Sequence, residues 1–167
     1  GELVEINFHP LPAVVDMDKA LTKEAPKLHD GCDDNVSFVY EVGDAAATEA
    51  AFARAAHVVK QRIHINRVAP SSLECRGCVA AYEPHSHCCT IYVGAQQSFV
   101  ARRLFARVIF DEPENAFRII PGDMGGGFGM KGAFYAEYVL TAWASRRLNR
   151  PVKWYADRSE AFLSDNH

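Results

Sequence analysis

The sequence predicts an α+β fold, in which helices pack on a layered, mixed sheet. Short β-rich segments alternate along the chain with longer segments of helical periodicity, an alternation that α/β chains share. Of the 167 residues, 49% are apolar and 23% are charged, which is the composition of a chain that buries a core. Eleven glycines and eight prolines are too few for a fibrous or low-complexity chain. We therefore expect a folded protein of strands and helices.

The first part of the chain is predicted to contain three strands and one helix. Each strand is a short run of alternating or β-branched residues, and the helix follows a capping aspartate at Asp44. A polar stretch broken by Pro10 and Pro12 connects the first strand to the second and forms an arm. The predicted strands are residues 3–8, 36–42 and 57–66, and the predicted helix is 45–56.

The second part is predicted to begin with a hairpin and to end with a strand. Two short strands are separated by a loop of hairpin length, and two segments carry the spacing of helices. The later of these helices is apolar around most of its circumference, which is typical of a buried helix. The predicted strands are 79–82, 90–93, 118–120 and 151–155, and the predicted helices are 97–109 and 133–148.

Composition excludes several classes of partner. The formal net charge is −3 without a long charged run, so we expect neither nucleic acid nor an anionic membrane surface as a partner. No stretch of about 18 apolar residues predicts a spanning helix and no signal peptide is evident, so a cytoplasmic location is expected.

Five cysteines are an odd number, and we expect reduced thiols. The chain opens with Gly1 instead of methionine and stops at His167 after a patterned segment, so we expect a longer parent polypeptide.

The glycine-rich segment 125–132 is the most distinctive chemical feature. Its five glycines allow a close approach of the backbone, so we expect it to bind an anion or an oxo group rather than to form only a tight turn. Residues 127–132 also fit the G-x-G-x-x-G pattern of dinucleotide-binding chains, with Asp157 as the acidic residue downstream. A phosphate-binding P-loop is excluded because Gly132, and not Ser or Thr, follows Lys131.

Several side chains have both a functional and a structural interpretation. Cysteines and histidines that could ligate zinc gather around the predicted hairpin, although two adjacent cysteines on one strand point to opposite faces. We favour buried thiols and a polar hairpin tip for this group, which comprises Cys75, Cys78, His85, His87, Cys88 and Cys89. The isolated carboxylates Glu74, Glu137 and Glu160 are interpreted as structural groups.

Motifs along almost the whole chain resemble the molybdopterin-binding large subunits of the xanthine oxidase family. The resemblance is greatest to the aerobic carbon-monoxide-dehydrogenase-type branch of that family. The C-terminal motifs that carry it are Gly125–Lys131, Tyr135–Tyr138, Arg150–Trp154 and Asp157–Glu160. The upstream motifs are Leu11–Asp16, Gly43-Asp44, Glu74–Gly77 and Gln96.

The resemblance implies a site, a cofactor and partners. In that family a Gly-Gly-Phe-Gly backbone approaches the molybdenum–pterin centre and a glutamine hydrogen-bonds an oxygen on the metal; the matching residues here are Gly126, Gly127, Phe128, Gly129 and Gln96. The implied cofactor is molybdenum bound to molybdopterin cytosine dinucleotide. The implied partners are the rest of the large subunit, iron–sulfur and flavin subunits or domains, and a small-molecule substrate. Such a cofactor brings its own metal ligands, so no protein side chain is expected to ligate the metal.

The resemblance also sets limits on activity and boundaries. Residues 1–35 would be the end of a preceding domain with a connecting arm, and residues 36–167 the first part of a molybdopterin-binding domain. The parent would oxidise an aldehyde, an N-heterocycle or a similar small molecule. Purine-oxidising relatives carry a carboxylate directly after the lysine of the glycine-rich segment, and Gly132 at this position disfavours a xanthine-type substrate. The general-base glutamate of the family lies downstream of this sequence, so the isolated chain is expected to be inactive. The alternative is a non-catalytic structural or assembly module that keeps the glycine-rich segment as a packing turn.

Overall fold

The computed structural model describes residues 3–166. The chain divides into two compact units between Arg62 and Ile63. The predicted boundary between residues 35 and 36 concerns the parent subunit and stays a prediction. Within residues 3–166, no helix combines the length and the apolar character needed to cross a membrane.

The first unit contains two helices, α1 (Met17–Ala20) and α2 (Ala45–Arg54). Each begins after an aspartate whose carboxylate accepts hydrogen bonds from free backbone N–H groups of the first turn. The Asp44 carboxylate accepts from the N–H of Ala47 at 2.9 Å. The sequence-based prediction of this capped helix is thereby confirmed.

The predicted strands 3–8, 36–42 and 57–66 are wrong. The structure leaves these segments as extended chain, and their apolar side chains are exposed: Val39 is 78% and Val59 is 90% accessible. Alternation is a property of one segment, whereas a strand also needs a neighbouring strand to accept and donate its ladder hydrogen bonds. No such neighbour exists among the described residues.

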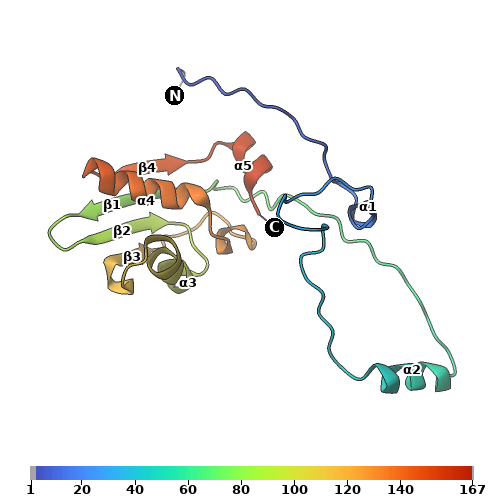
Figure 1. The fold of residues 1–167 in the computed structure, drawn as a ribbon. Coiled ribbons are helices and arrows are strands. Elements are labelled where there is room, and N and C mark those ends of the chain that lie inside the picture. Colours follow the sequence, from blue (N-terminus) through green and yellow to red (C-terminus); the bar gives the residue numbers. More distant parts are fainter. Residues whose placement is uncertain (1–2, 167) are drawn as a thin grey trace. The chain divides into compact units, whose positions relative to one another are not determined.

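The second unit is built on a four-stranded mixed sheet (Figure 1). The strands lie in the order β3-β2-β1-β4; β2 and β3 are parallel, and the other neighbours are antiparallel. Their bounds are β1 (Gly77–Glu83), β2 (Cys88–Val93), β3 (Phe117–Ile120) and β4 (Val152–Tyr155). The predicted hairpin, the predicted strands at 118–120 and 151–155 and the α+β class are confirmed.

The first helix of the second unit differs from its prediction. The segment expected as one helix over 97–109 is α3 (Ser98–Arg103) followed by η1, a π-helical segment over Leu104–Phe110. The π-helical winding is wider than that of an α-helix, and its hydrogen bonds connect residues five positions apart. It brings the ring of Phe105 parallel to that of Phe110, with centroids 6.2 Å apart.

The later helices also differ from the prediction in detail. The single 3₁₀ turns are η2 (Glu114–Ala116) and η3 (Met130–Gly132), and the remaining helices are α4 (Ala136–Leu148) and α5 (Arg158–Ser164). Helix α4 begins three residues later than predicted, so a short extended segment separates it from η3, which forms the end of the glycine-rich segment. Helix α5 was not predicted.

The core lies on one face of the sheet. Helix α4 packs over β1 and β4, and α3 packs beside β3. Alternate residues of the strands are buried with aromatic and small residues of η1 and α4; the fully buried members include Ala80, Cys89, Ile91, Phe105, Ala106 and Ala142. On the opposite face the side chains of Tyr92 and Tyr155 are half exposed. The helices therefore cover one face of the sheet and leave the other open.

Candidate functional site

The glycine-rich segment forms an irregular loop after β3. Gly126, Phe128 and Gly129 have φ values of +99°, +50° and +92°, in or near the left-handed region that glycine adopts without strain. Phe128 carries a side chain in that region, and its ring is 69% exposed. Non-glycine residues with such backbone angles are uncommon and gather at functional sites. The loop therefore stores strain at an exposed aromatic residue.

The parallel pairing of β2 and β3 brings Gln96 to this loop. Tyr92 pairs with Ile120 at the ends of the two strands, so the residues that follow them emerge at the same edge of the sheet. The Oε1 atom of Gln96 accepts a hydrogen bond from the N–H of Gly129 at 3.1 Å. A Cβ atom on Gly127 would lie 2.8 Å from that oxygen, so a side chain at this position would displace the glutamine.

Three consecutive N–H groups of the loop can donate to a ligand. The N–H groups of Gly126, Gly127 and Phe128 have no acceptor among residues 3–166. Because Oε1 of Gln96 is bonded to Gly129, its amide NH₂ group is left to donate as well. Neutral donors arranged in this way stabilise an anion or a metal-bound oxygen without adding a titrating group. The chemistry of these donors therefore fits an oxo-bearing cofactor.

An ion pair between a buried lysine and a partly exposed glutamate lies beside the loop. The Lys131 ammonium contacts the Glu74 carboxylate at 2.5 Å. The hydrogen bond from Lys131 holds the pKa of Glu74 below its ordinary value, although partial burial opposes the shift. Sequence reasoning treated Glu74 as an isolated structural carboxylate, because nothing in the sequence connects it with a residue 57 positions away.

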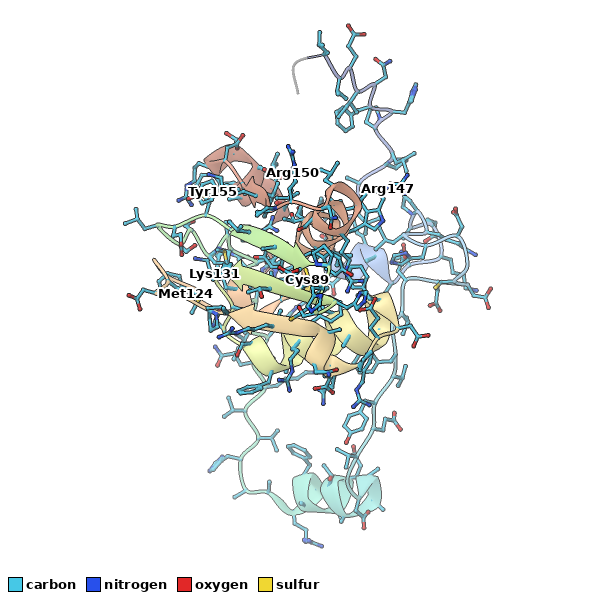
Figure 2. The ribbon with its side chains drawn as sticks, turned by 90° about the vertical axis from the view of Figure 1, so that its left-hand side faces the viewer. Cys89, Met124, Lys131, Arg147, Arg150 and Tyr155 are labelled. Atoms are coloured by element: carbon cyan, nitrogen blue, oxygen red, sulfur yellow. The ribbon has the colours of Figure 1, made fainter. Side chains whose placement is uncertain are left out.

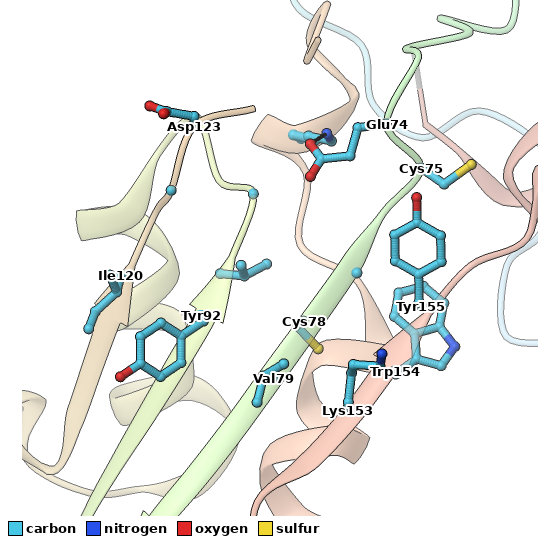
Figure 3. Close-up of a pocket in the computed structure, with 15 residues that line it drawn as sticks. Glu74, Cys75, Cys78, Val79, Tyr92, Ile120, Asp123, Lys153, Trp154 and Tyr155 are labelled. Carbon is cyan, nitrogen blue, oxygen red and sulfur yellow. Dashed lines mark hydrogen bonds and ion pairs between the residues drawn. The ribbon is translucent and has the colours of Figure 1, made fainter. Parts of the chain in front are cut away.

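An open pocket of about 290 Å³ adjoins this pair. Figure 3 shows Glu74 and Asp123 at one end of the pocket and Val79, Tyr92 and Lys153 along the uncovered sheet face. Apolar and charged groups thus share one concave surface next to the loop.

The zinc interpretation does not fit the structure. Cys75, Cys78 and Cys89 are buried, and no three of the described His, Cys, Asp and Glu side chains come together as a metal site. Burial raises the pKa of Cys89 to about 11, so this thiol is protonated and a poor metal ligand near neutral pH. The ring of His87 is paired with the Tyr82 hydroxyl at 3.0 Å.

The dinucleotide interpretation does not fit either. A dinucleotide fingerprint needs a parallel βαβ unit whose helix begins at the glycines. Here η3 follows the glycines, and β4, the strand after α4, pairs antiparallel with β1. The acidic residue downstream of the glycine pattern, Asp157, instead caps α5 by accepting from the N–H of Glu160 at 2.7 Å.

The second unit is an α+β domain in which a glycine-rich loop lies against a glutamine. The family model of the molybdopterin cofactor-binding domain matches residues 28–167. The chain belongs to this family, and the resemblance to large subunits of the xanthine oxidase family is confirmed.

Relatives of this chain are subunits of larger enzymes. It is 37% identical to the carbon monoxide dehydrogenase large chain of Hydrogenophaga pseudoflava, over 99% of this chain and 23% of that one. It is 33% identical to the nicotine 6-hydroxylase large subunit of Paenarthrobacter nicotinovorans, over 99% of this chain and 20% of that one. The chain thus spans less than a quarter of the length of these relatives.

Solved structures share the fold. Reconstituted CO dehydrogenase from Oligotropha carboxidovorans superimposes with a TM-score of 0.83 at 37% identity, over 96% of this chain and 21% of that one. Quinoline 2-oxidoreductase from Pseudomonas putida 86 superimposes with a TM-score of 0.82 at 32% identity, over 99% of this chain and 21% of that one.

Proposed function

We propose that this chain is the part of a molybdenum hydroxylase large subunit that places a glycine-rich loop and a glutamine against the molybdenum–pterin centre. The observation that carries the proposal is the contact between Gln96 and the loop. Its Oε1 accepts from Gly129, and the free N–H groups of Gly126, Gly127 and Phe128 lie in the same loop. These residues fit molybdenum bound to molybdopterin cytosine dinucleotide, since they offer donors and no competing metal ligand.

In this proposal the protein residues orient and polarise, and the cofactor carries the redox chemistry. The backbone N–H groups of Gly126 to Phe128 would donate to oxygen atoms of the centre. The Gln96 amide would fix the direction of one such oxygen while its Oε1 holds Gly129. The left-handed backbone of Phe128, with φ of +50°, lies within this run of donors.

The proposed substrate is an aldehyde, an N-heterocycle or a similar small molecule. The names of two relatives, nicotine 6-hydroxylase and quinoline 2-oxidoreductase, support the N-heterocyclic class. The proposed partners are the rest of the large subunit and chains or domains that carry iron–sulfur clusters and flavin, because electrons from substrate oxidation must leave the centre. The relatives' names as large or gamma subunits support an assembly of several chains.

The test compares Gln96→Ala with Gln97→Ala in cofactor-loaded protein purified with the chains it assembles with. Gln97 is a matched control, because its side chain makes no hydrogen bond within residues 3–166. Loss of an orienting hydrogen bond costs roughly 1–3 kcal/mol, so turnover of Gln96→Ala should fall about 5- to 150-fold. Gln97→Ala should match the wild type.

Two results would contradict the proposal. The first is unchanged turnover in a Gln96→Ala protein that contains full molybdenum. The second is a well-folded wild-type complex without molybdenum or pterin by elemental and pterin analysis. That second result would favour the alternative, a structural or assembly module in which the loop is a packing turn.

A further inference from the structure

Glu74, three residues before β1, contacts both ends of the glycine-rich loop. At the entry of the loop, its carboxylate Oε2 accepts from the N–H of Gly125 at 2.9 Å, and its own N–H donates to the Gly125 carbonyl at 3.0 Å. At the exit, the same Oε2 accepts from the Lys131 ammonium at 2.5 Å. One carboxylate therefore connects two points of the loop that are six positions apart.

Close backbone contacts hold Glu74 against the loop. A Cβ atom on Gly125 would lie 2.6 Å from the Glu74 Cβ, so the absence of a side chain at 125 lets the two backbones approach. The Ser72 hydroxyl donates to the Glu74 carbonyl at 2.7 Å and fixes the backbone of the segment. The position of Glu74 relative to the loop is thus defined by backbone contacts as well as by its charge.

Lys131 connects Glu74 with Gln96. The Lys131 side chain is 1% exposed, and an ammonium buried to that degree needs its counter-charge. Its backbone carbonyl accepts from the N–H of Gln96 at 3.0 Å. Figure 2 shows Lys131 beside Met124. The side chains of both residues approach Gly94, so the two residues that flank the loop lie close together.

We propose that Glu74 is a positioning residue for the molybdenum–pterin site, acting by fixing the shape of the loop 125–129. Consecutive glycines have no strong conformational preference of their own, so contacts from outside must select one loop geometry. Glu74 supplies such contacts at Gly125 and Lys131, and Gln96 supplies one at Gly129. The inference rests on the proposed function of the loop.

The test uses Glu74→Gln in cofactor-loaded protein purified with the chains it assembles with. The matched control is Glu114→Gln, since the Glu114 carboxylate is also ion-paired, with Arg102 at 3.1 Å and Arg107 at 2.9 Å, but does not contact the loop. Loss of a charge-assisted hydrogen bond should raise amide hydrogen exchange of residues 124–132 and lower kcat, each by about tenfold or more, and should change KM little. The Mo(V) electron paramagnetic resonance signal should shift in Glu74→Gln and stay unchanged in Glu114→Gln.

A double variant separates positioning from stability. Glu74→Gln combined with Lys131→Met leaves no ammonium buried without its counter-charge, so it also serves if Glu74→Gln does not fold. If Glu74 positions the loop, the double variant folds normally but keeps the low kcat and the shifted signal. Recovery of wild-type kcat and signal in the double variant would overturn the inference.

Gln96→Ala measured in parallel distinguishes the two proposals. If Gln96→Ala alters the molybdenum signal and Glu74→Gln alters neither the signal nor exchange of the loop, the positioning role is wrong and the proposed function stands. If neither variant alters the signal in protein with full molybdenum, both are wrong.

Discussion

The two units of this chain contain similar sequence patterns and reach different structures. Residues 36–42 and 57–66 alternate as clearly as residues 90–93, yet only the last segment forms a strand. Ile91 of β2 is fully buried between paired strands and helices, whereas no described residue of the first unit is buried. Alternation therefore marks a segment that is able to form a strand, and a paired neighbour decides whether the strand forms.

The helices of the two units differ in the same way. Helix α2 has a side-chain cap at Asp44 and no buried residue, so local interactions stabilise it. Helix α4 has no side-chain cap but buries Tyr138, Thr141, Ala142 and Ser145 against the sheet. Substitutions should therefore act through packing in the second unit and through local hydrogen bonds in the first.

The largest difference is expected from core truncation. Phe105→Ala removes a ring that stacks on Phe117, with centroids 5.6 Å apart, and should lower the free energy of unfolding by about 3–5 kcal/mol. Val59→Ala in the first unit should change it by less than about 0.5 kcal/mol, because Val59 is exposed. Denaturant unfolding followed by circular dichroism measures both. Equal effects would contradict the assignment of the core to the second unit.

A smaller loss is expected from the buried arginine of the second unit. Arg76 is fully buried and donates to Asp165 and Ser164, both at 2.5 Å, with its guanidinium 3.7 Å from the ring centroid of Tyr135. Arg76→Met leaves Asp165 without its counter-charge and should cost about 3 kcal/mol. Faster hydrogen exchange in α5 would accompany the loss. The exposed Arg147→Met is the control and should behave as the wild type.

The next effect tests local stabilisation in the first unit. Asp44→Ala removes the cap of α2 and should destabilise that helix by about 1 kcal/mol. Amide exchange should rise within 45–54 and remain unchanged in β1 and β2. A matching rise in the strands would show that the two units unfold together and would contradict local stabilisation of α2.

The smallest effect concerns pH. Arg146 pairs with Glu112 through two hydrogen bonds of 2.6 Å, and these hold the pKa of Glu112 below its ordinary value. The folded-state pKa is the lower one, so the stabilisation is present above the unfolded-state pKa and is lost as pH falls through the lowered pKa. In Glu112→Gln, the free energy of unfolding of the second unit should decrease less as pH falls than in the wild type, by about 1 kcal/mol or less. An unchanged pH dependence would contradict this contribution.

Sequence patterns predict much of the second unit because its elements carry local signals. The hairpin of β1 and β2 has strand-forming residues on both sides of a short loop, and the prediction lies within two residues of the observed bounds. Helix α5 also had a usable signal, since Asp157 and Glu160 stand three positions apart as in a helix cap. The π-helical turn of η1 depends on the packing of Phe105 and Phe110, which spacing alone does not specify.

Part of the candidate site could be predicted from sequence motifs, and part is revealed only by the fold. Gly126, Gly127, Phe128, Gly129 and Gln96 could be named from motifs, and the structure brings the loop and the glutamine together. Their role at a cofactor stays a prediction. The contacts of Glu74 with Gly125 and Lys131 join residues more than 50 positions apart, so only the fold reveals them.

An experimental structure of the cofactor-loaded protein tests the central claim most directly. We expect the N–H groups of Gly126, Gly127 and Phe128 and the Gln96 amide to lie within hydrogen-bond distance of oxygen atoms of the molybdenum–pterin centre. The claim would be contradicted by a fully occupied cofactor that neither the loop nor Gln96 contacts.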